Sequence, residues 1–251
     1  MTKTLIITGG ASGIGAETAR RAAERGYKVA INYRSRSAQA EAIVAEIKAK
    51  GGQAVALPGN MASEADIVKM FAEAEQALGP ITHLVNSAGI SVRTRVAEYD
   101  AAVLANIFAV NVIGLMLCCR EAAKRMSTKT GGKGGAIVNV SSIASTLGGR
   151  SGSSAYAATK GAVDSFTKGF ATEVAAEGIR VNSIRPGMVM SEMTERRLQD
   201  PAFRAGIEAS IPMRRVGEGR EIADAILWLL SGESSFITGA MLDAAGGGYR
   251  I

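Results

Sequence analysis

The chain has 251 residues, of which 47% are hydrophobic and 21% charged, with a formal net charge of +6. This composition excludes a disordered chain and predicts one globular domain over residues 1–251. The longest apolar runs, such as Leu5–Ile7 and Ile137–Val140, are strand-sized, so no membrane span is expected. Met1–Thr4 leads directly into such a run without a secretory pattern, so we expect a cytoplasmic protein.

Basic residues are scattered, without the recognition module or the aromatic-basic interleaving of a nucleic-acid-binding domain. An anionic cofactor or substrate explains the positive charge as easily as nucleic acid does. Cys118 and Cys119 are adjacent in an apolar helical segment, so we expect packing residues rather than a disulfide or a zinc site. The sequence has no cluster of His, Asp and Glu residues that would indicate a catalytic metal.

Short apolar strands alternate with segments of helical period, which is typical of an α/β fold. Near-continuous apolar strands predict a doubly wound parallel sheet, covered on both faces, with ligands at the carboxyl ends of the strands. The segment 188–212 is predicted to be a mobile helical insertion over the site. The predicted strands are 4–8, 28–33, 54–57, 81–86, 135–141 and 180–184, and the predicted helices are 15–25, 37–50, 63–78, 99–126 and 154–177.

A glycine-rich turn follows the first predicted strand and opens a helix. Glycines let backbone N–H groups approach a pyrophosphate, and the helix N-terminus supplies partial positive charge. A turn of purely structural use is the alternative, but its place between strand and helix favours a dinucleotide site. The residues assigned to this site are Gly9, Ser12, Gly13, Ile14 and Gly15.

The end of the second predicted strand indicates which dinucleotide binds. An acidic residue there would accept hydrogen bonds from the ribose 2′-OH of NAD, but the sequence from Asn32 to Arg36 contains none. Arg34 can pair with a 2′-phosphate and Ser35 adds a hydroxyl, so NADP(H) is predicted over NAD. The alternative is that Arg34 is only an exposed surface charge.

Tyr156 and Lys160 are four residues apart, on one face of a predicted helix. A phenol of pKa ~10 is a poor base near neutrality, but a neighbouring ammonium group lowers that pKa. Tyr156 could then exchange a proton with a substrate oxygen. Such a pair is common by chance, and a surface lysine near a half-buried tyrosine is the alternative.

Other motifs accompany this pair along the chain, namely Asn86–Gly89, Asn111, Ser141–Ser142 and Pro186–Gly187. Together with the glycine-rich turn, they have the order and spacing of the short-chain dehydrogenase/reductase family, which the chain resembles over essentially its full length. The resemblance implies a single-domain Rossmann fold with a seven-stranded sheet of order 3-2-1-4-5-6-7, and usually a homotetramer.

The resemblance also implies a catalytic set. Tyr156 would be the acid/base, Lys160 would lower its pKa and hydrogen-bond the nicotinamide ribose, and Ser142 would polarise the carbonyl, with Ser141 as the alternative. Asn111 would kink the long helix and hold a water for proton relay from Lys160, or would only bend the helix.

The remaining cofactor site follows from the same resemblance. Asn60 stands where the family commonly has an Asp that contacts the adenine amine. His83 stands where many relatives carry Asp, and we expect a solvent-side residue at the strand entry rather than a catalyst. The further cofactor-binding residues are Asn60, Met61, Asn86, Ala88, Gly89, Pro186, Gly187, Val189 and Ser191.

These features predict hydride transfer between NADP(H) and a small-molecule carbonyl or secondary alcohol. The nearest patterns resemble 3-oxoacyl-carrier-protein reductases and glucose-dehydrogenase-like members. A non-catalytic NADP-binding sensor or scaffold is the alternative, which the intact catalytic set disfavours. An acidic carrier protein could meet four basic residues, namely Lys124, Arg125, Lys129 and Lys168.

Overall fold

A computed structural model describes residues 3–190, 194–195 and 198–248. In that part of the chain, seven strands form one parallel sheet of order β3-β2-β1-β4-β5-β6-β7, which confirms the predicted fold. The strands are β1 (Lys3–Thr8), β2 (Tyr27–Tyr33), β3 (Ala54–Pro58), β4 (His83–Asn86), β5 (Gly135–Val140), β6 (Ile179–Pro186) and β7 (Met241–Ala244).

The central strands are apolar because both faces of the sheet are covered. Leu5, Ile6 and Ile7 of β1 are all fully buried. Ile7 pairs with Ile31 of β2 on one side and with Val85 of β4 on the other. This parallel register brings the carboxyl ends of neighbouring strands to one edge, where the residues that follow them gather.

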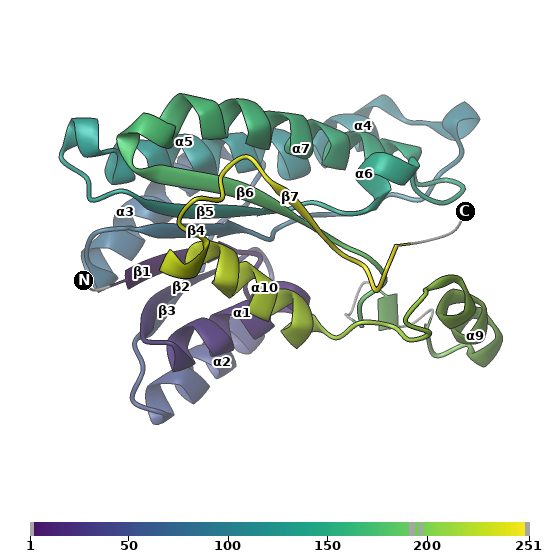
Figure 1. Cartoon of the computed structure of the whole chain (residues 1–251), viewed down its shortest axis with the longest axis horizontal. Helices are drawn as coiled ribbons and strands as arrows, with labels where there is room; N and C mark the ends of the chain where they lie inside the picture. Colours follow the sequence, from purple (N-terminus) through teal and green to yellow (C-terminus); the bar gives the residue numbers. More distant parts are fainter. Residues whose placement is uncertain (1–2, 191–193, 196–197, 249–251) are drawn as a thin grey trace.

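Helices α1, α2 and α10 cover one face, and α3, α5 and α7 cover the other (Figure 1). Capping side chains mark two helix starts: Ser63 accepts a hydrogen bond from the N–H of Asp66, and Asp100 accepts one from the N–H of Val103. The helices are α1 (Gly13–Glu24), α2 (Ser37–Ala49), α3 (Glu64–Leu78), α4 (Ala101–Phe108), α5 (Leu115–Met126), α6 (Ala144–Leu147), α7 (Ser154–Val174), α9 (Pro201–Ser210) and α10 (Gly219–Leu230).

The predicted helix 99–126 is divided into α4, a π-helical segment η2 (Ala109–Gly114) and α5. Residues Ala101–Met126 are long and apolar enough to cross a membrane by length and composition, so the expectation of only strand-sized apolar runs was wrong. In the fold the α5 half of this run is part of the core: α5 packs against α3 and β4, and Cys118 and Cys119 are fully buried, as expected of packing residues. In α4 Ile107 is the buried residue, and most of the other residues of that helix are exposed.

Segment 188–212 contains α9, which lies beyond the carboxyl ends of the strands (Figure 1). The helical character predicted for this segment is present, and its ordering on ligand binding stays a prediction. Leu198, Ile207 and Ile211 form a small buried cluster with Val216, separate from the two main cores. The segment therefore has apolar packing of its own.

We expected His83 to lie on the solvent side because of its place at the strand entry, and this expectation was wrong. His83 is the first residue of β4, is 7% exposed, and packs edge-to-face against Tyr27 with ring centroids 5.1 Å apart. Burial, assisted by the charge of Lys3, lowers the pKa of His83 from 6.5 to about 4. The ring is therefore neutral at physiological pH.

A buried base with a lowered pKa makes the fold sensitive to acid. Stability from neutral His83 is complete above pH 6.5 and is lost as the pH falls towards 4, so lowering the pH from 7 to 5 should cost on the order of 2 kcal/mol from this group. We expect His83→Asn, which cannot protonate in this range, to lose correspondingly less stability between pH 7 and pH 5. Urea unfolding at both pH values measures this, and equal losses in the two proteins would contradict it.

Candidate active site

One cleft of about 1140 Å³ lies at the carboxyl ends of the central strands. It is lined by residues that follow β1, β2, β3, β4, β5 and β6, together with the first turns of α1 and α7. The predicted site residues that line it are Gly9, Ser12, Gly13, Ile14, Arg34, Ser35, Asn60, Met61, Ala88, Gly89, Ser142, Tyr156, Lys160, Pro186, Gly187 and Val189.

The glycine-rich turn needs glycine for two physical reasons. Gly9 has φ +64°, and a Cβ there would lie 2.8 Å from the Cα of Ala88 in the turn after β4. A Cβ on Gly15 would collide with the carbonyl oxygen of Gly9, so the helix can start close to the turn only with glycine. The side chain of Ser12 makes no capping hydrogen bond to α1, which leaves first-turn N–H groups available to an anion.

Two polar side chains that our sequence analysis did not assign hold this turn in place. Thr8 accepts hydrogen bonds through Oγ1 from the N–H groups of Ser87 and Ala88, both at 3.1 Å. Asn32 accepts one from the N–H of Gly9 at 3.2 Å and donates to the carbonyl oxygen of Gly59 at 3.1 Å. The sequence signal that could have identified Thr8 and Asn32 is their position: each is a polar residue at or next to the end of an otherwise apolar strand.

The loop after β2 presents basic groups at one end of the cleft. Arg34 and Ser35 are exposed and line it, and Arg34 has no hydrogen-bond or ion-pair partner among the described residues. Asn60, on the neighbouring loop, accepts a hydrogen bond through Oδ1 from the N–H of Ala62 at 3.1 Å. The cleft therefore has a cationic end beside the glycine-rich turn.

Tyr156 and Lys160 lie on consecutive turns of α7, with the Lys160 Nζ 5.7 Å from the centre of the Tyr156 ring. Lys160 is 5% exposed and donates a hydrogen bond to the carbonyl oxygen of Val140 at 2.7 Å. Burial lowers the pKa of Lys160 to about 8, and the nearby charge of Asp164 opposes that change.

Burial raises the pKa of the Tyr156 phenol above its ordinary value of 10, and hydrogen bonding with Ser142 opposes that rise. This direction is opposite to the one expected from the spacing of Tyr156 and Lys160, because desolvation outweighs the other influences. The phenol is therefore protonated at neutral pH, which suits a proton donor.

Ser142 and Ser141 have different surroundings. Ser142 lies beside Tyr156, lines the cleft, and accepts a hydrogen bond from the N–H of Ala144 at 3.1 Å. Ser141 is buried and donates to the carbonyl oxygen of Lys160 at 3.2 Å, which attaches α7 to the end of β5. Ser142 is thus the serine whose hydroxyl meets the tyrosine.

Asn111 lies in the π-helical segment η2, behind the cleft wall. Its amide accepts a hydrogen bond from the N–H of Ile90 at 2.8 Å and donates to the carbonyl oxygen of Ile90 at 2.9 Å and to Oγ1 of Thr159 at 3.1 Å. The side chain therefore joins η2, the loop after β4 and α7, and its predicted part in proton relay stays a prediction.

Three other predicted residues lie outside the cleft lining or outside the described residues. Gly15 lies behind the glycine-rich turn, within the first turn of α1. Asn86 is buried, and its amide donates to Asn139 at 2.9 Å and to the sulfur of Cys119 at 3.3 Å, away from the cleft. Ser191 lies outside the described residues.

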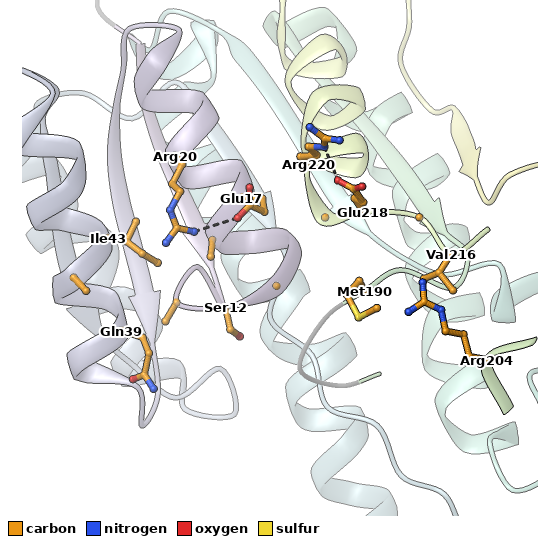
Figure 2. Close-up of a pocket in the computed structure, with 16 residues that line it drawn as sticks. Ser12, Glu17, Arg20, Gln39, Ile43, Met190, Arg204, Val216, Glu218 and Arg220 are labelled. Atoms are coloured by element: carbon orange, nitrogen blue, oxygen red, sulfur yellow. Dashed lines mark hydrogen bonds and ion pairs between the residues drawn. The ribbon is translucent and has the colours of Figure 1, made fainter. Parts of the chain in front are cut away.

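A second cavity, of about 780 Å³, lies on the other side of the glycine-rich turn. Figure 2 shows Arg20 reaching Glu17 within α1, and Arg220 reaching Glu218 at the start of α10. These cationic side chains are neutralised by adjacent glutamates, and Ser12 lines both cavities.

The basic residues considered for a carrier protein lie far from the cleft. Lys124 and Arg125 pair with Glu121 near the end of α5, and Lys129 pairs with Glu177 at 3.1 Å. The N–H of Gly134 bonds to the carbonyl oxygen of Met126, which places this region at the amino end of β5. Lys168 is 12 residues beyond Tyr156 on α7, about 18 Å along the helix.

Comparisons with known proteins agree with this architecture. The family model described as "Enoyl-(Acyl carrier protein) reductase" matches residues 9–249. The chain is 44% identical over 243 residues to the "Uncharacterized oxidoreductase YgfF" of Escherichia coli, covering 96% of this chain and 98% of that protein. It is 35% identical over 254 residues to the "3-oxoacyl-[acyl-carrier-protein] reductase FabG" of Staphylococcus aureus, covering 99% of each.

A solved short-chain dehydrogenase/reductase of Serratia marcescens, a double mutant, has the same fold with a TM-score of 0.91 and 29% identity. The match covers 98% of this chain and 97% of that one. The chain belongs to the short-chain dehydrogenase/reductase family and is an oxidoreductase.

The hydrogen bonds of Asn111 allow a test of its supporting role. Asn111→Ala leaves the N–H and C=O of Ile90 without partners, so we expect a loss of roughly 1–3 kcal/mol in the free energy of unfolding. The matched control is Asn106→Ala on the exposed side of α4, which should change stability by less than about 0.5 kcal/mol. Urea unfolding measures both, and equal stabilities for the two variants would exclude this role.

Proposed function

We propose that the chain is an NADP(H)-dependent reductase of small-molecule carbonyl compounds, with Tyr156 as the proton donor. The observation that carries the proposal is the meeting of the hydroxyl groups of Tyr156 and Ser142 in one cleft, beside the buried ammonium group of Lys160. Two hydroxyl donors at one point suit a single carbonyl oxygen, which gains negative charge as it is reduced.

The residues of the cleft fit a bound dinucleotide. Gly9 and Gly15 leave no room for side chains where the turn approaches its neighbours, and the start of α1 offers N–H groups to a pyrophosphate. Lys160 lies deep in the same cleft, at the end of β5. In this proposal it holds the nicotinamide ribose through its ammonium group.

NADPH, when bound, supplies the hydride that adds to the carbonyl carbon of the substrate. Ser142 orients and polarises the carbonyl, and Tyr156 gives its phenolic proton to the carbonyl oxygen. The raised pKa of Tyr156 supports the direction of reduction, because the phenol begins in the protonated state. Oxidation of the alcohol would need the phenolate, so it should be favoured by higher pH.

Arg34 supports the choice of NADP(H) over NAD(H). It is exposed at the cationic end of the cleft, and no acidic residue lies between Asn32 and Arg36 to bind a ribose 2′-OH. A guanidinium group without another partner in the described residues can form paired hydrogen bonds with a 2′-phosphate.

A small-molecule substrate is favoured over an acidic carrier protein, because the four basic residues considered for docking lie towards the amino ends of the strands, whereas the cleft lies at the carboxyl ends.

We also infer a homo-oligomer. Val103 and Phe108 of α4 and Ile113 of η2 are 42%, 37% and 54% exposed, and apolar side chains left open in this way are typical of a surface that a second copy covers. A cytoplasmic location belongs to the same proposal, and packing of α5 in the core supports it over membrane insertion.

The experiment that tests the reaction measures NADPH oxidation with acetoacetyl thioesters, ketones and diketones, and NADP⁺ reduction with sugars and secondary alcohols. We expect turnover with one of these classes, and Tyr156→Phe should reduce kcat by at least about a hundredfold while NADPH still binds, because only the proton donor is lost. Tight NADPH binding without any turnover would favour a non-catalytic sensor or scaffold. Comparable kcat values in Tyr156→Phe and the unaltered protein would remove Tyr156 from its role.

Cofactor selectivity is tested separately with Arg34→Ala. Losing a charge-assisted contact to the 2′-phosphate should weaken NADPH binding about tenfold or more, whereas NADH binding should change less than about twofold. Titration of both cofactors against each protein gives the ratio. An equal change in both affinities would mean that Arg34 does not read the 2′-phosphate.

A further inference from the structure

Asp164 lies one helical turn beyond Lys160, so Tyr156, Lys160 and Asp164 share one face of α7. The residue is 8% exposed, although it carries a charge. Its Oδ1 accepts a hydrogen bond from the hydroxyl of Ser183 at 3.0 Å, and its Oδ2 accepts one from Nε of Arg185 at 2.9 Å. A carboxylate held on both oxygens has a fixed position.

Both partners of Asp164 belong to β6, the strand that leads into the turn lining the cleft. Ser183 and Arg185 lie on β6, and Arg185 is followed directly by the turn Pro186–Gly187 that lines the cleft. Arg185 also donates through a terminal nitrogen to Asp243 of β7 at 3.2 Å. The ion pair therefore attaches the catalytic helix to β6 and β7 beside the reacting groups.

The charged groups around Lys160 are few. On α7 the charged neighbour is Asp164, while the phenol of Tyr156 is ionisable but neutral, and behind Asp164 stand Arg185 from β6 and Asp243 from β7. The parts of β5 and η2 that approach Lys160 have no ionisable side chain. Asp164, four residues from Lys160, is the acidic residue nearest to it along α7, and its charge raises the pKa of Lys160 against the effect of burial.

We propose that Asp164, held by Ser183 and Arg185, is a positioning residue that fixes Lys160 in the cleft and supplies the negative charge that stabilises its buried ammonium group. The proposal rests on the function proposed above, in which charged Lys160 holds the nicotinamide ribose. It adds a residue outside the Tyr156, Lys160, Ser142 and Asn111 set, and this residue acts through Lys160 without touching the substrate.

The test is Asp164→Asn, which keeps the size and a hydrogen-bond acceptor but removes the charge. Lys160 should then lose its proton at lower pH, so the alkaline limit of kcat should move down by roughly one pH unit. With this shift, kcat at pH 8 falls roughly fivefold, whereas kcat at pH 6 and the KM of the carbonyl substrate change less than about twofold. The alkaline limit of NADPH binding, followed by nicotinamide fluorescence without substrate, should shift in the same direction.

Glu173→Gln is the matched control, because it removes one negative charge from an exposed position of the same helix. Its pH profiles should coincide with those of the unaltered protein. The double variant Asp164→Asn with Arg185→Gln leaves no unpaired buried charge and covers the case in which the single variant is unstable. Its alkaline limit should also stay below that of the unaltered protein.

A loss of activity that is equal at every pH, with unmoved alkaline limits in both Asp164 variants, would overturn the proposal and leave Asp164 a purely structural residue. If the unaltered protein binds NADPH but turns over no substrate, the proposed reaction fails by itself. The pH profile of NADPH binding then decides the role of Asp164 alone.

Discussion

The buried ammonium group of Lys160 is the constraint around which the site is organised. A charge in such a place is costly unless polar groups surround it, and the carbonyl oxygen of Val140 at the end of β5 accepts its hydrogen bond. Helix α7 must therefore lie so that Lys160 reaches the end of β5. With the helix in that place, Tyr156 lies at the edge of the cleft beside Ser142.

The glycine-rich turn is connected to the half of the cleft that holds Tyr156 and Lys160 through close backbone contacts. Gly9 approaches Ala88 so closely that only glycine fits, and Thr8 hydrogen-bonds the backbone of the same turn after β4. The next residues of that turn reach Asn111 through Ile90, and Asn111 reaches α7 through Thr159. A dinucleotide bound along this path would have both ends placed by one connected set of contacts.

Local sequence patterns were sufficient for strands β1 to β6, the helical segments up to α7 and the glycine-rich turn, because each depends on neighbours in the chain. The seventh strand was expected only from the family resemblance. They failed where the environment comes from distant residues. Burial against Tyr27 could not be read from the surroundings of His83 in the sequence. The apolar residues of 101–126 could not indicate which elements would cover them, and the amide of Asn86 points into the core and not into the cleft.

The sequence by itself determined the residue types of the site and their order: a glycine-rich turn after an apolar strand, an arginine after the next strand, and a tyrosine and a lysine one helical turn apart. Only the tertiary structure decided their electrostatic states. It raised the pKa of Tyr156, lowered that of Lys160, and placed Asp164 against Ser183 and Arg185. The reason is that desolvation and charge pairing depend on which distant segments cover a group, and spacing along the chain does not contain that information.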